Sequence, residues 1–216
     1  WIPLRMDMLI ELSQGFRNTL AIFFITLALA MPLGFVVMLL KKSRFKPVSL
    51  LTTFYISVMR GTPLMLQLMF VYFGPYYLFG LSSPDRFRAA IVAFVFNYAA
   101  YFAEIYRGGF EAIPRGQLEA AEVLGLSKAQ TFFKIQLPQV MKTVMPSITN
   151  EVITLVKDTS LAMVISVSET FIIAKAMAAR EASMTPYLAV AAFYYAMNYL
   201  VAFIMDRIEK GLDYYR

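Results

Sequence analysis

Long apolar runs separated by short polar segments dominate the sequence. A transmembrane helix needs about 20 predominantly apolar residues to cross the hydrocarbon core of a bilayer. Five runs are close to this length or exceed it, at about residues 16–40, 50–72, 89–106, 145–167 and 187–205. The pattern therefore predicts an all-α membrane protein with five transmembrane helices, which form a single domain over residues 1–216.

The basic residues orient these crossings. Four of them follow the first run with no acid among them: Lys41, Lys42, Arg44 and Lys46. Such a cluster is typical of a cytoplasmic loop. Five crossings then place the N-terminus outside and the C-terminus in the cytoplasm, with twelve of the 20 Lys and Arg inside and six outside. The other two, Arg60 and Lys157, fall within the membrane.

The chain opens at Trp1 rather than Met, so a few native residues are expected to be missing or replaced there. The first apolar run is too long for a signal peptide and lacks a small-residue cleavage site, so we expect it to be retained. Between the last two runs, residues 169–181 are expected to form a short external helix with Phe171, Ala174 and Ala178 on its apolar side.

A polar and apolar loop at about residues 111–139 lies between the third and fourth runs, on the cytoplasmic side. Its pattern predicts a helix, a turn and a second helix. Leu118, Ala121 and Leu124 share one face of the first helix. Gly125 supplies the permissive backbone that ends this helix.

The second helix of the loop is expected to begin at Ser127. The Ser127 hydroxyl and the Gln130 side chain have the spacing of a capping box. Phe132 and Ile135 continue an apolar face. Pro138 lacks the N–H that a further turn needs, so we expect the helix to stop there.

Composition excludes several classes of protein. Hydrophobic residues make up 59% of the chain and charged residues only 16%, with a mean hydropathy of +0.61, which is too apolar for a soluble domain. The sequence contains no Cys and no His, so disulfides, thiol chemistry and the commonest metal ligand are excluded, and we expect no metal site. A net charge of +6 could indicate a nucleic acid partner, but the chain is expected to lie in membrane lipid, so no nucleic acid partner is expected.

A membrane enzyme and a channel are the rival classes. Zinc proteases and Ser-His hydrolases require His, and an aspartyl protease requires two facing intramembrane Asp, whereas only Asp158 qualifies. A channel requires rings of carbonyls or repeated charges, and nothing in the sequence repeats in that way. No Walker-type phosphate-binding motif is present either. We therefore expect no catalytic residues and no cofactor bound by this chain.

Polar residues in the second run predict a broken helix. Arg60-Gly61-Thr62-Pro63 lies near its middle. Pro63 cannot donate a hydrogen bond, and its ring opposes a helical conformation at Thr62. Transporters expose backbone groups to a substrate at such breaks. The alternative is a packing kink in which Arg60 reaches the interface or pairs with a neighbouring acid.

The third run carries a polar face. Asn97, Tyr101 and Glu104 are spaced so that they share one side of a helix, which should look into the protein. Glu104 is a candidate ligand for a substrate. Pairing with Arg60 or Arg107 is the equally open alternative.

The fourth run carries Lys157-Asp158-Thr159-Ser160 near its centre. Lys157 and Asp158 are adjacent and cannot face the same way on a regular helix, so local unwinding or partners on other helices are expected. Thr159 and Ser160 can satisfy freed backbone groups or bind a ligand. Glu151 lies nearer the cytoplasmic end and is interpreted as structural.

The cytoplasmic loop closely resembles the conserved loop of importer-type ATP-binding-cassette (ABC) permeases. Its markers are Glu119-Ala-Ala, Gly125, Ile135 and Leu137-Pro138, at the family spacing. The resemblance implies a coupling helix that docks on an ATPase subunit. The residues that it implies for this contact are Glu119, Ala120, Ala121, Gly125 and Leu126. An ordinary amphipathic linker and a DNA-reading helix-turn-helix are the alternatives.

Four further segments look like those of the polar amino acid permeases within this group, which serve histidine, arginine, glutamine and similar substrates. They are Arg60–Pro63, Ala103–Gly109, Ile113–Gln117 and Lys157–Leu161. The resemblance implies the type I ABC importer fold in the cell membrane. It also implies a pair of permease subunits, two ATPase subunits that bind ATP and Mg²⁺, and an extracellular or periplasmic substrate-binding protein.

The acids favour a basic substrate, namely arginine, lysine or histidine. Glu104 and Asp158 leave room for a cationic side chain, and Arg60 or the amides freed at Pro63 can take the carboxylate. Glutamine or another polar amino acid is the alternative, because Arg60 and Lys157 can neutralise both acids. The candidate substrate-binding residues are Arg60, Asn97, Tyr101, Glu104, Asp158, Thr159 and Ser160. Whether the second permease subunit is identical stays open, although we favour a homodimer.

Overall fold

The computed structural model describes residues 6–212, and within that range it contains helices and no strand. The expected all-α fold is therefore confirmed. The helices are α1 Met6–Lys41, α2 Lys46–Gly61, α3 Leu64–Phe79, α4 Arg86–Glu111, α5 Arg115–Val123, α6 Lys128–Thr131, the π-helical turn η1 Phe132–Gln136, α7 Leu137–Asp158, the 3₁₀ segment η2 Thr159–Ile165, α8 Thr170–Glu181 and α9 Thr185–Gly211.

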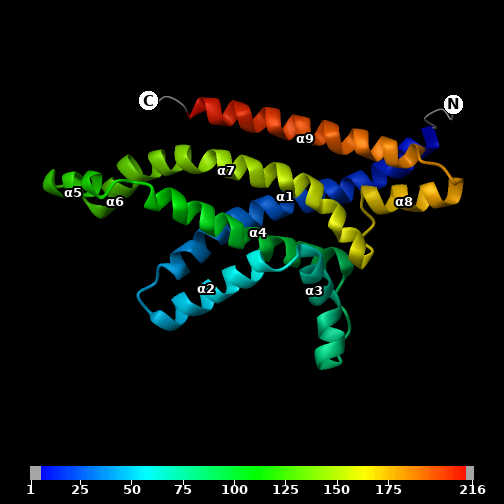
Figure 1. Cartoon of the computed structure of the whole chain (residues 1–216), viewed down its shortest axis with the longest axis horizontal. Coiled ribbons are helices and arrows are strands. Elements are labelled where there is room, and N and C mark those ends of the chain that lie inside the picture. Colours follow the sequence, from blue (N-terminus) through cyan, green and yellow to red (C-terminus); the bar gives the residue numbers. More distant parts are fainter. Residues whose placement is uncertain (1–5, 213–216) are drawn as a thin grey trace.

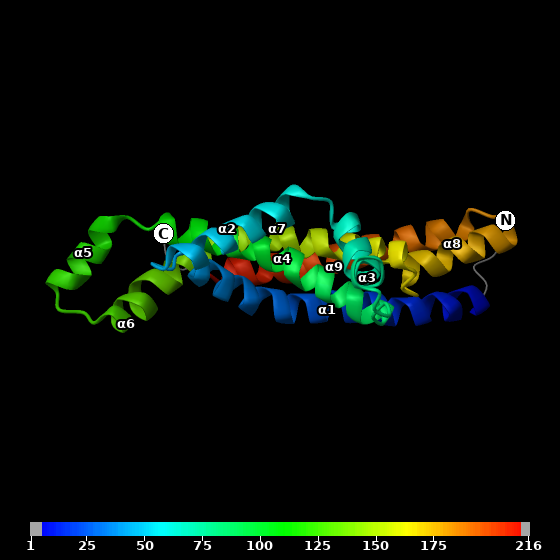
Figure 2. The same ribbon diagram turned by 90° about the horizontal axis from the view of Figure 1, so that it is seen from below.

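The long helices α1, α4, α7 and α9 follow the long axis of the molecule (Figure 1). The loop with α5 and α6 extends from one end, close to the C-terminal end of α9, in both views (Figures 1 and 2). At the other end α8 packs beside the N-terminal half of α1, and Ala174 on α8 is fully buried. The expected helix at residues 169–181 is thus present, and its external position stays a prediction.

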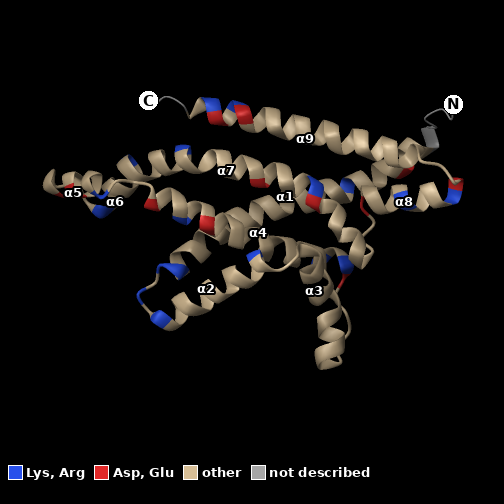
Figure 3. Cartoon of the chain, viewed as in Figure 1, with Lys and Arg blue, Asp and Glu red and all other residues tan. Residues whose placement is uncertain are grey.

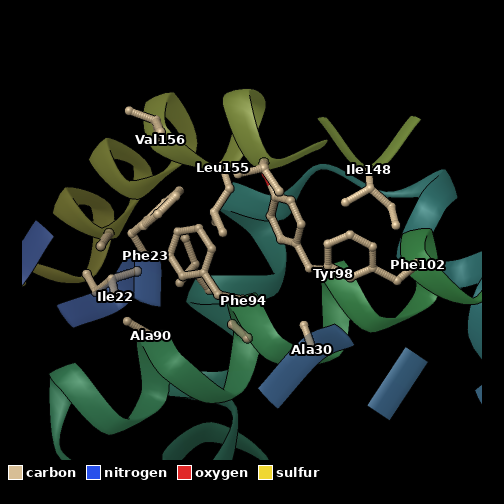
Figure 4. Close-up of a cluster of buried hydrophobic side chains, with 14 of the residues drawn as sticks. Ile22, Phe23, Ala30, Ala90, Phe94, Tyr98, Phe102, Ile148, Leu155 and Val156 are labelled. Atoms are coloured by element: carbon tan, nitrogen blue, oxygen red, sulfur yellow. The ribbon is translucent and has the colours of Figure 1, made fainter. Parts of the chain in front are cut away.

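The core lies where α4 packs between α1 and α7. Phe94, Tyr98 and Phe102 of α4 are buried, and Tyr98 and Phe102 point toward Leu155 and Ile148 of α7 (Figure 4). Apolar and aromatic residues four apart place these α4 side chains on one helix face. This contact positions α4 and thereby the polar residues Asn97, Tyr101 and Glu104 that it carries.

A glycine allows α1 and α4 to approach closely. A methyl group at Gly34 would lie 2.7 Å from the Cβ atom of Phe102 and 3.0 Å from the carbonyl oxygen of Ala99. Small residues permit such close packing between membrane helices. The α1–α4 contact is therefore sensitive to any larger residue at Gly34.

Within the part of the chain that the structure describes, three helices, at residues 8–41, 86–111 and 185–211, are long and apolar enough to cross a membrane. Two bent pairs extend this number to as many as five. One pair is α2 with α3, bent by 112°, and the other joins residues 128–165 to α8 with a bend of 60°. The predicted number of crossings lies within this range, and their exact limits and orientation stay predictions.

The expectation that Pro138 ends a helix is wrong. Pro138 lies in the first turn of α7, where an N–H is not needed, and the chain continues helically from α6 through η1. The N–H of Leu137 donates to the carbonyl oxygen of Phe132, five residues earlier. This π-helical turn accommodates the proline without interrupting the helix.

Candidate functional site

The break between α2 and α3 is held open by side-chain amides. Gln67 Nε2 donates to the carbonyl oxygen of Met59 at 3.0 Å and to Thr62 Oγ1 at 2.8 Å. Asn97 Nδ2 donates to the same Met59 carbonyl at 3.1 Å and to Gln67 Oε1 at 2.9 Å. The two amides replace the backbone donor that Pro63 lacks. The predicted break is present, and its conformation depends on α3 and α4.

This arrangement gives Asn97 a structural task. Asn97 is 5% exposed, and both hydrogens of its amide nitrogen are used at the break. Gln67 was not among the sequence-derived candidates. A glutamine four residues after Pro63, in an otherwise apolar run, was the available signal.

Arg60 lies at the end of α2 beside the break, next to two of the predicted residues of α4. Its guanidinium carbon lies 5.3 Å from the centre of the Tyr101 ring, within cation–π range. Its Nη1 atom lies 3.8 Å from Glu104 Oε2. The Arg60 side chain is 45% exposed, so it remains accessible to a ligand. The structure therefore brings Arg60, Tyr101 and Glu104 together.

Glu104 is also paired with two further cations. Lys41 Nζ, at the end of α1, donates to Glu104 Oε1. Arg107 donates to Glu104 Oε2 at 2.9 Å from Nη2 and at 3.1 Å from Nε. The Glu104 side chain is only 13% exposed. Three cations thus surround one carboxylate at the end of α1. Pairing of Glu104 with Arg60 and Arg107 was the alternative that the sequence left open, and the structure shows both pairs and a third with Lys41.

Asp158 ends α7 and contacts α4. Asp158 Oδ2 accepts a hydrogen bond of 2.8 Å from the hydroxyl of Tyr98, which is buried. Glu151 lies seven residues earlier on the same face of α7 and interacts electrostatically with both Asp158 and Arg60. Glu151 was interpreted from the sequence as structural, although its spacing from Asp158 was a signal for a shared face.

The hydroxyls that follow Asp158 bond to their own helix. Thr159 Oγ1 donates to the carbonyl oxygen of Val156 at 2.7 Å, and Ser160 Oγ donates to that of Lys157 at 2.8 Å. These bonds accompany the change from α-helix to the 3₁₀ segment η2, which is the local unwinding expected at Lys157 and Asp158. Thr159 is fully buried, whereas Ser160 is partly exposed.

The loop that contains α5 and α6 is closed by two caps. The N–H of Gly125 donates to Glu122 O at 2.9 Å and the N–H of Leu126 donates to Ala121 O at 3.0 Å, with Gly125 at φ +75°. This is the Schellman arrangement that ends α5. At the start of α6, Ser127 and Gln130 form the predicted capping box.

Exposure divides the residues of this loop into two groups. Glu119 and Ala120 are exposed, whereas Ala121 is 1% exposed. The expected shared face of Leu118, Ala121 and Leu124 is therefore split between different environments. Val123 and Leu124 are 87% and 78% exposed, although neither was among the candidates. Val123 and Leu124 form an exposed apolar tip of the loop, and Glu119 and Ala120 lie beside this tip.

Among the residues that the structure describes, no group of three or more Asp and Glu side chains is placed to hold a metal ion. The features that the structure does show are charged side chains paired between helices, a broken helix and a capped loop. The family model for the inner membrane component of binding-protein-dependent transport systems matches residues 30–214. The chain belongs to this family. It is a permease subunit of an amino acid ABC importer and lies in the cell membrane.

Relatives with named substrates differ among themselves. The chain is 40% identical over 200 residues to the arginine transport system permease protein ArtQ of Bacillus subtilis, with 92% of this chain and 91% of ArtQ covered. It is 33% identical over 200 residues to the putative glutamine transport system permease protein GlnP of Rickettsia bellii, with the same coverage. Family membership does not by itself select one amino acid.

Solved structures are similar over nearly the whole chain. A crystal structure of an amino acid ABC transporter with histidines is 30% identical, with a TM-score of 0.85, and the match covers 97% of this chain and 99% of that one. The type I importer permease fold is thereby established. Membership of the permease family implies an ATPase and a substrate-binding protein as partners.

Proposed function

We propose that this permease imports basic amino acids, namely arginine, lysine or histidine, by alternating access. The cluster around Arg60 carries this proposal. The carboxylate of an amino acid would bind Arg60, assisted by the N-terminal end of α3, where the backbone N–H groups favour an anion. Arg60 would then be less available to neutralise Glu151 of α7, with which it interacts electrostatically.

Asp158 and Glu151 are the acids that would receive the positive charges of the substrate. Glu104 is less suited to this task than the sequence-based hypothesis required, because Lys41 and Arg107 already neutralise it. Asp158 has the neutral hydroxyl of Tyr98 as its hydrogen-bond donor. Two acids on one face of α7 match the ammonium group and the cationic side chain of a basic amino acid. The similarity to ArtQ supports the same substrate class.

The remaining predicted site residues have supporting positions in this proposal. Tyr101 holds the guanidinium of Arg60 through its ring, and Asn97 fixes the break beside it. Thr159 and Ser160 stabilise the 3₁₀ turn that follows Asp158, and Ser160 is accessible enough to contact substrate.

The cytoplasmic loop would transmit the motion of the ATPase. We assign the contact to Val123 and Leu124, with Glu119 and Ala120 at its rim. Ala121, Gly125 and Leu126 would act by holding the shape of the α5 end. Two ATPase subunits would bind ATP and Mg²⁺ and hydrolyse the nucleotide, so the permease itself performs no chemical catalysis. An extracellular or periplasmic binding protein would deliver the amino acid.

Substrate-stimulated ATPase activity of the reconstituted complex tests the substrate assignment. Wild type should respond to arginine more strongly than to glutamine. Asp158→Asn and Glu151→Gln should each weaken the arginine response about 30-fold or more, because losing one desolvated ionic partner costs roughly 2–5 kcal/mol. Asp206→Asn, which removes an exposed acid paired with Lys210 on α9, is the matched control. A wild type that prefers glutamine contradicts the basic substrate while leaving the permease assignment intact.

A further inference from the structure

An apolar groove lies between α1, α4 and α7. Its volume is about 460 Å³. Its walls include Pro32, Phe35 and Val36 of α1, Phe110 of α4, and Met141 of α7, and none of the lining residues is charged. The groove takes no part in the Arg60 cluster or in the exposed tip of the coupling loop. A volume of this size accommodates part of a flexible hydrocarbon chain.

The groove opens on a surface that is already apolar. Val36 is 48% exposed and Met141 is 37% exposed. Along α1, Ile25, Leu29 and Leu40 are also exposed, and their spacing places them on the same helix face as Val36. A continuous exposed apolar stripe on a transmembrane helix is suited to lipid. The groove is therefore a recess in an apolar surface that is suited to contact with lipid.

Uncompensated positive charge lies at one end of the groove. The ammonium of Lys42 lies 5.7 Å from the centre of the Phe110 ring, which forms part of the groove wall. Arg44 follows on the turn between α1 and α2, and Lys46 is the first residue of α2. Figure 3 shows a group of basic residues in this region. All three basic side chains are exposed, and within residues 6–212 none of them forms an ion pair with a carboxylate.

We propose that the groove and the α1–α2 turn together bind an anionic phospholipid of the cytoplasmic leaflet. One acyl chain would occupy the groove, and the phosphate would face Lys42 with Arg44 and Lys46 around it. Charge complementarity selects this occupant, because a neutral lipid or an apolar protein helix would leave the three cations without a partner. Lys41, the last residue of α1, directly precedes Lys42 and holds Glu104, so the lipid would stabilise the end of α1 beside the substrate site.

Native mass spectrometry of the purified transporter complex can test this site. The complex is exchanged into phosphatidylglycerol or phosphatidylcholine with identical acyl chains, and the retained lipid is counted. We expect preferential retention of phosphatidylglycerol. Lys42→Gln and Arg44→Gln should each lower its affinity about fivefold, the size expected for one basic residue at an anionic membrane surface. Lys175→Gln, an exposed basic residue on α8, is the control for charge.

The groove itself is tested with Val36→Trp, which fills the recess from an exposed position. This variant should lower retention of phosphatidylglycerol, whereas Leu29→Trp, on the same stripe but outside the groove lining, should not. Equal retention of the two lipids by wild type would overturn the proposal. Displacement of the lipid by inorganic phosphate would also overturn it, since the acyl chain would then contribute nothing. A disulfide between two copies of Val36→Cys, in a chain without native Cys, would assign the groove to a protein interface instead.

Discussion

The carboxylate of Glu104 pairs with the ammonium of Lys41, which joins α4 to the last turn of α1. Arg107 and Arg60 contact the same carboxylate from α4 and α2. Glu104 therefore connects three helices at the end of α1 that is predicted to face the cytoplasm. An acid that is neutralised in this way contributes to stability and to the position of Arg60 more than to recognition of a cation.

We expect Glu104→Gln to lower stability without changing substrate preference. Loss of the anion removes the carboxylate partner of Lys41 and Arg60 and one of the two carboxylate partners of Arg107. The expected cost is about 1–3 kcal/mol, because Lys41 and Arg107 remain partly exposed to solvent. Thermal unfolding of the complex should show the loss, and the ratio of arginine to glutamine stimulation of the ATPase should stay constant. Glu111→Gln, which removes the other, exposed partner of Arg107, should have a much smaller effect.

The sequence-based hypothesis made the opposite prediction for Glu104. If Glu104 instead received the cationic side chain of the substrate, as the sequence suggests, Glu104→Gln would weaken the response to a basic amino acid. A normal melting temperature combined with a lost arginine response would support Glu104 as a substrate ligand and contradict its structural role.

Patterns that act over a few residues allowed much of the fold to be predicted. Hydropathy gave the helices, and local steric rules gave the break at Pro63 and the caps at Gly125 and Ser127. Pro138 was misread because a proline stops a helix in its interior and is tolerated in its first turn. The sequence alone does not show whether a proline lies in the interior or in the first turn of a helix when a π-helical turn precedes it and the chain stays helical.

The site was harder to predict because its contacts join residues far apart in the chain. Lys41 is the first basic residue of a loop by sequence, yet it reaches Glu104 on α4. Gln67 was overlooked, although it holds the break together with Asn97. Ala121 fits the family pattern of an exposed contact, whereas the fold of the loop buries it. Such assignments depend on how helices pack, which periodicity alone does not specify.

The amides of Gln67 and Asn97 should act as a unit at the helix break. Gln67→Leu and Asn97→Leu each remove a donor to the carbonyl oxygen of Met59, and each should cost about 1–3 kcal/mol. The double variant should cost less than the sum, because the two side chains also bond to each other. Denaturation of the four proteins of this cycle measures the coupling. Strictly additive losses would show that the amides do not cooperate at the break.

The exposed tip of the coupling loop should control contact with the ATPase. Leu124→Asp should reduce uptake and ATPase copurification while leaving the permease folded, because this side chain is 78% exposed. Leu81→Asp, at a leucine 59% exposed in the α3–α4 connection, is the control. Uptake and copurification equal to wild type in Leu124→Asp would exclude the tip from the contact.

Gly125→Asp should also uncouple transport, through the backbone rather than through lost contacts. Gly125 adopts φ +75°, which costs other residues roughly 1–2 kcal/mol, although space around its Cα is open. The expected result is a membrane domain that stays assembled, with less substrate-stimulated ATPase activity. Gly116→Asp, where a side chain also meets no neighbour and the backbone is α-helical, should be milder. Full uptake by Gly125→Asp would show that the end of α5 tolerates rearrangement.

Two copies of this chain should pair so that their α2 helices approach the two-fold axis. Arg60 is 45% exposed and Lys157 is exposed in the single chain, and a charge facing hydrocarbon costs about 2.5–3.5 kcal/mol or more. A second subunit and the aqueous route between the two would cover these charges, and an identical subunit closes the assembly with two-fold symmetry. Because the chain contains no Cys, Ser57→Cys, one turn before Arg60, should crosslink to itself, whereas Leu200→Cys on α9 should not. If Ser57→Cys yields adducts only with a different permease subunit, the transporter is a heterodimer.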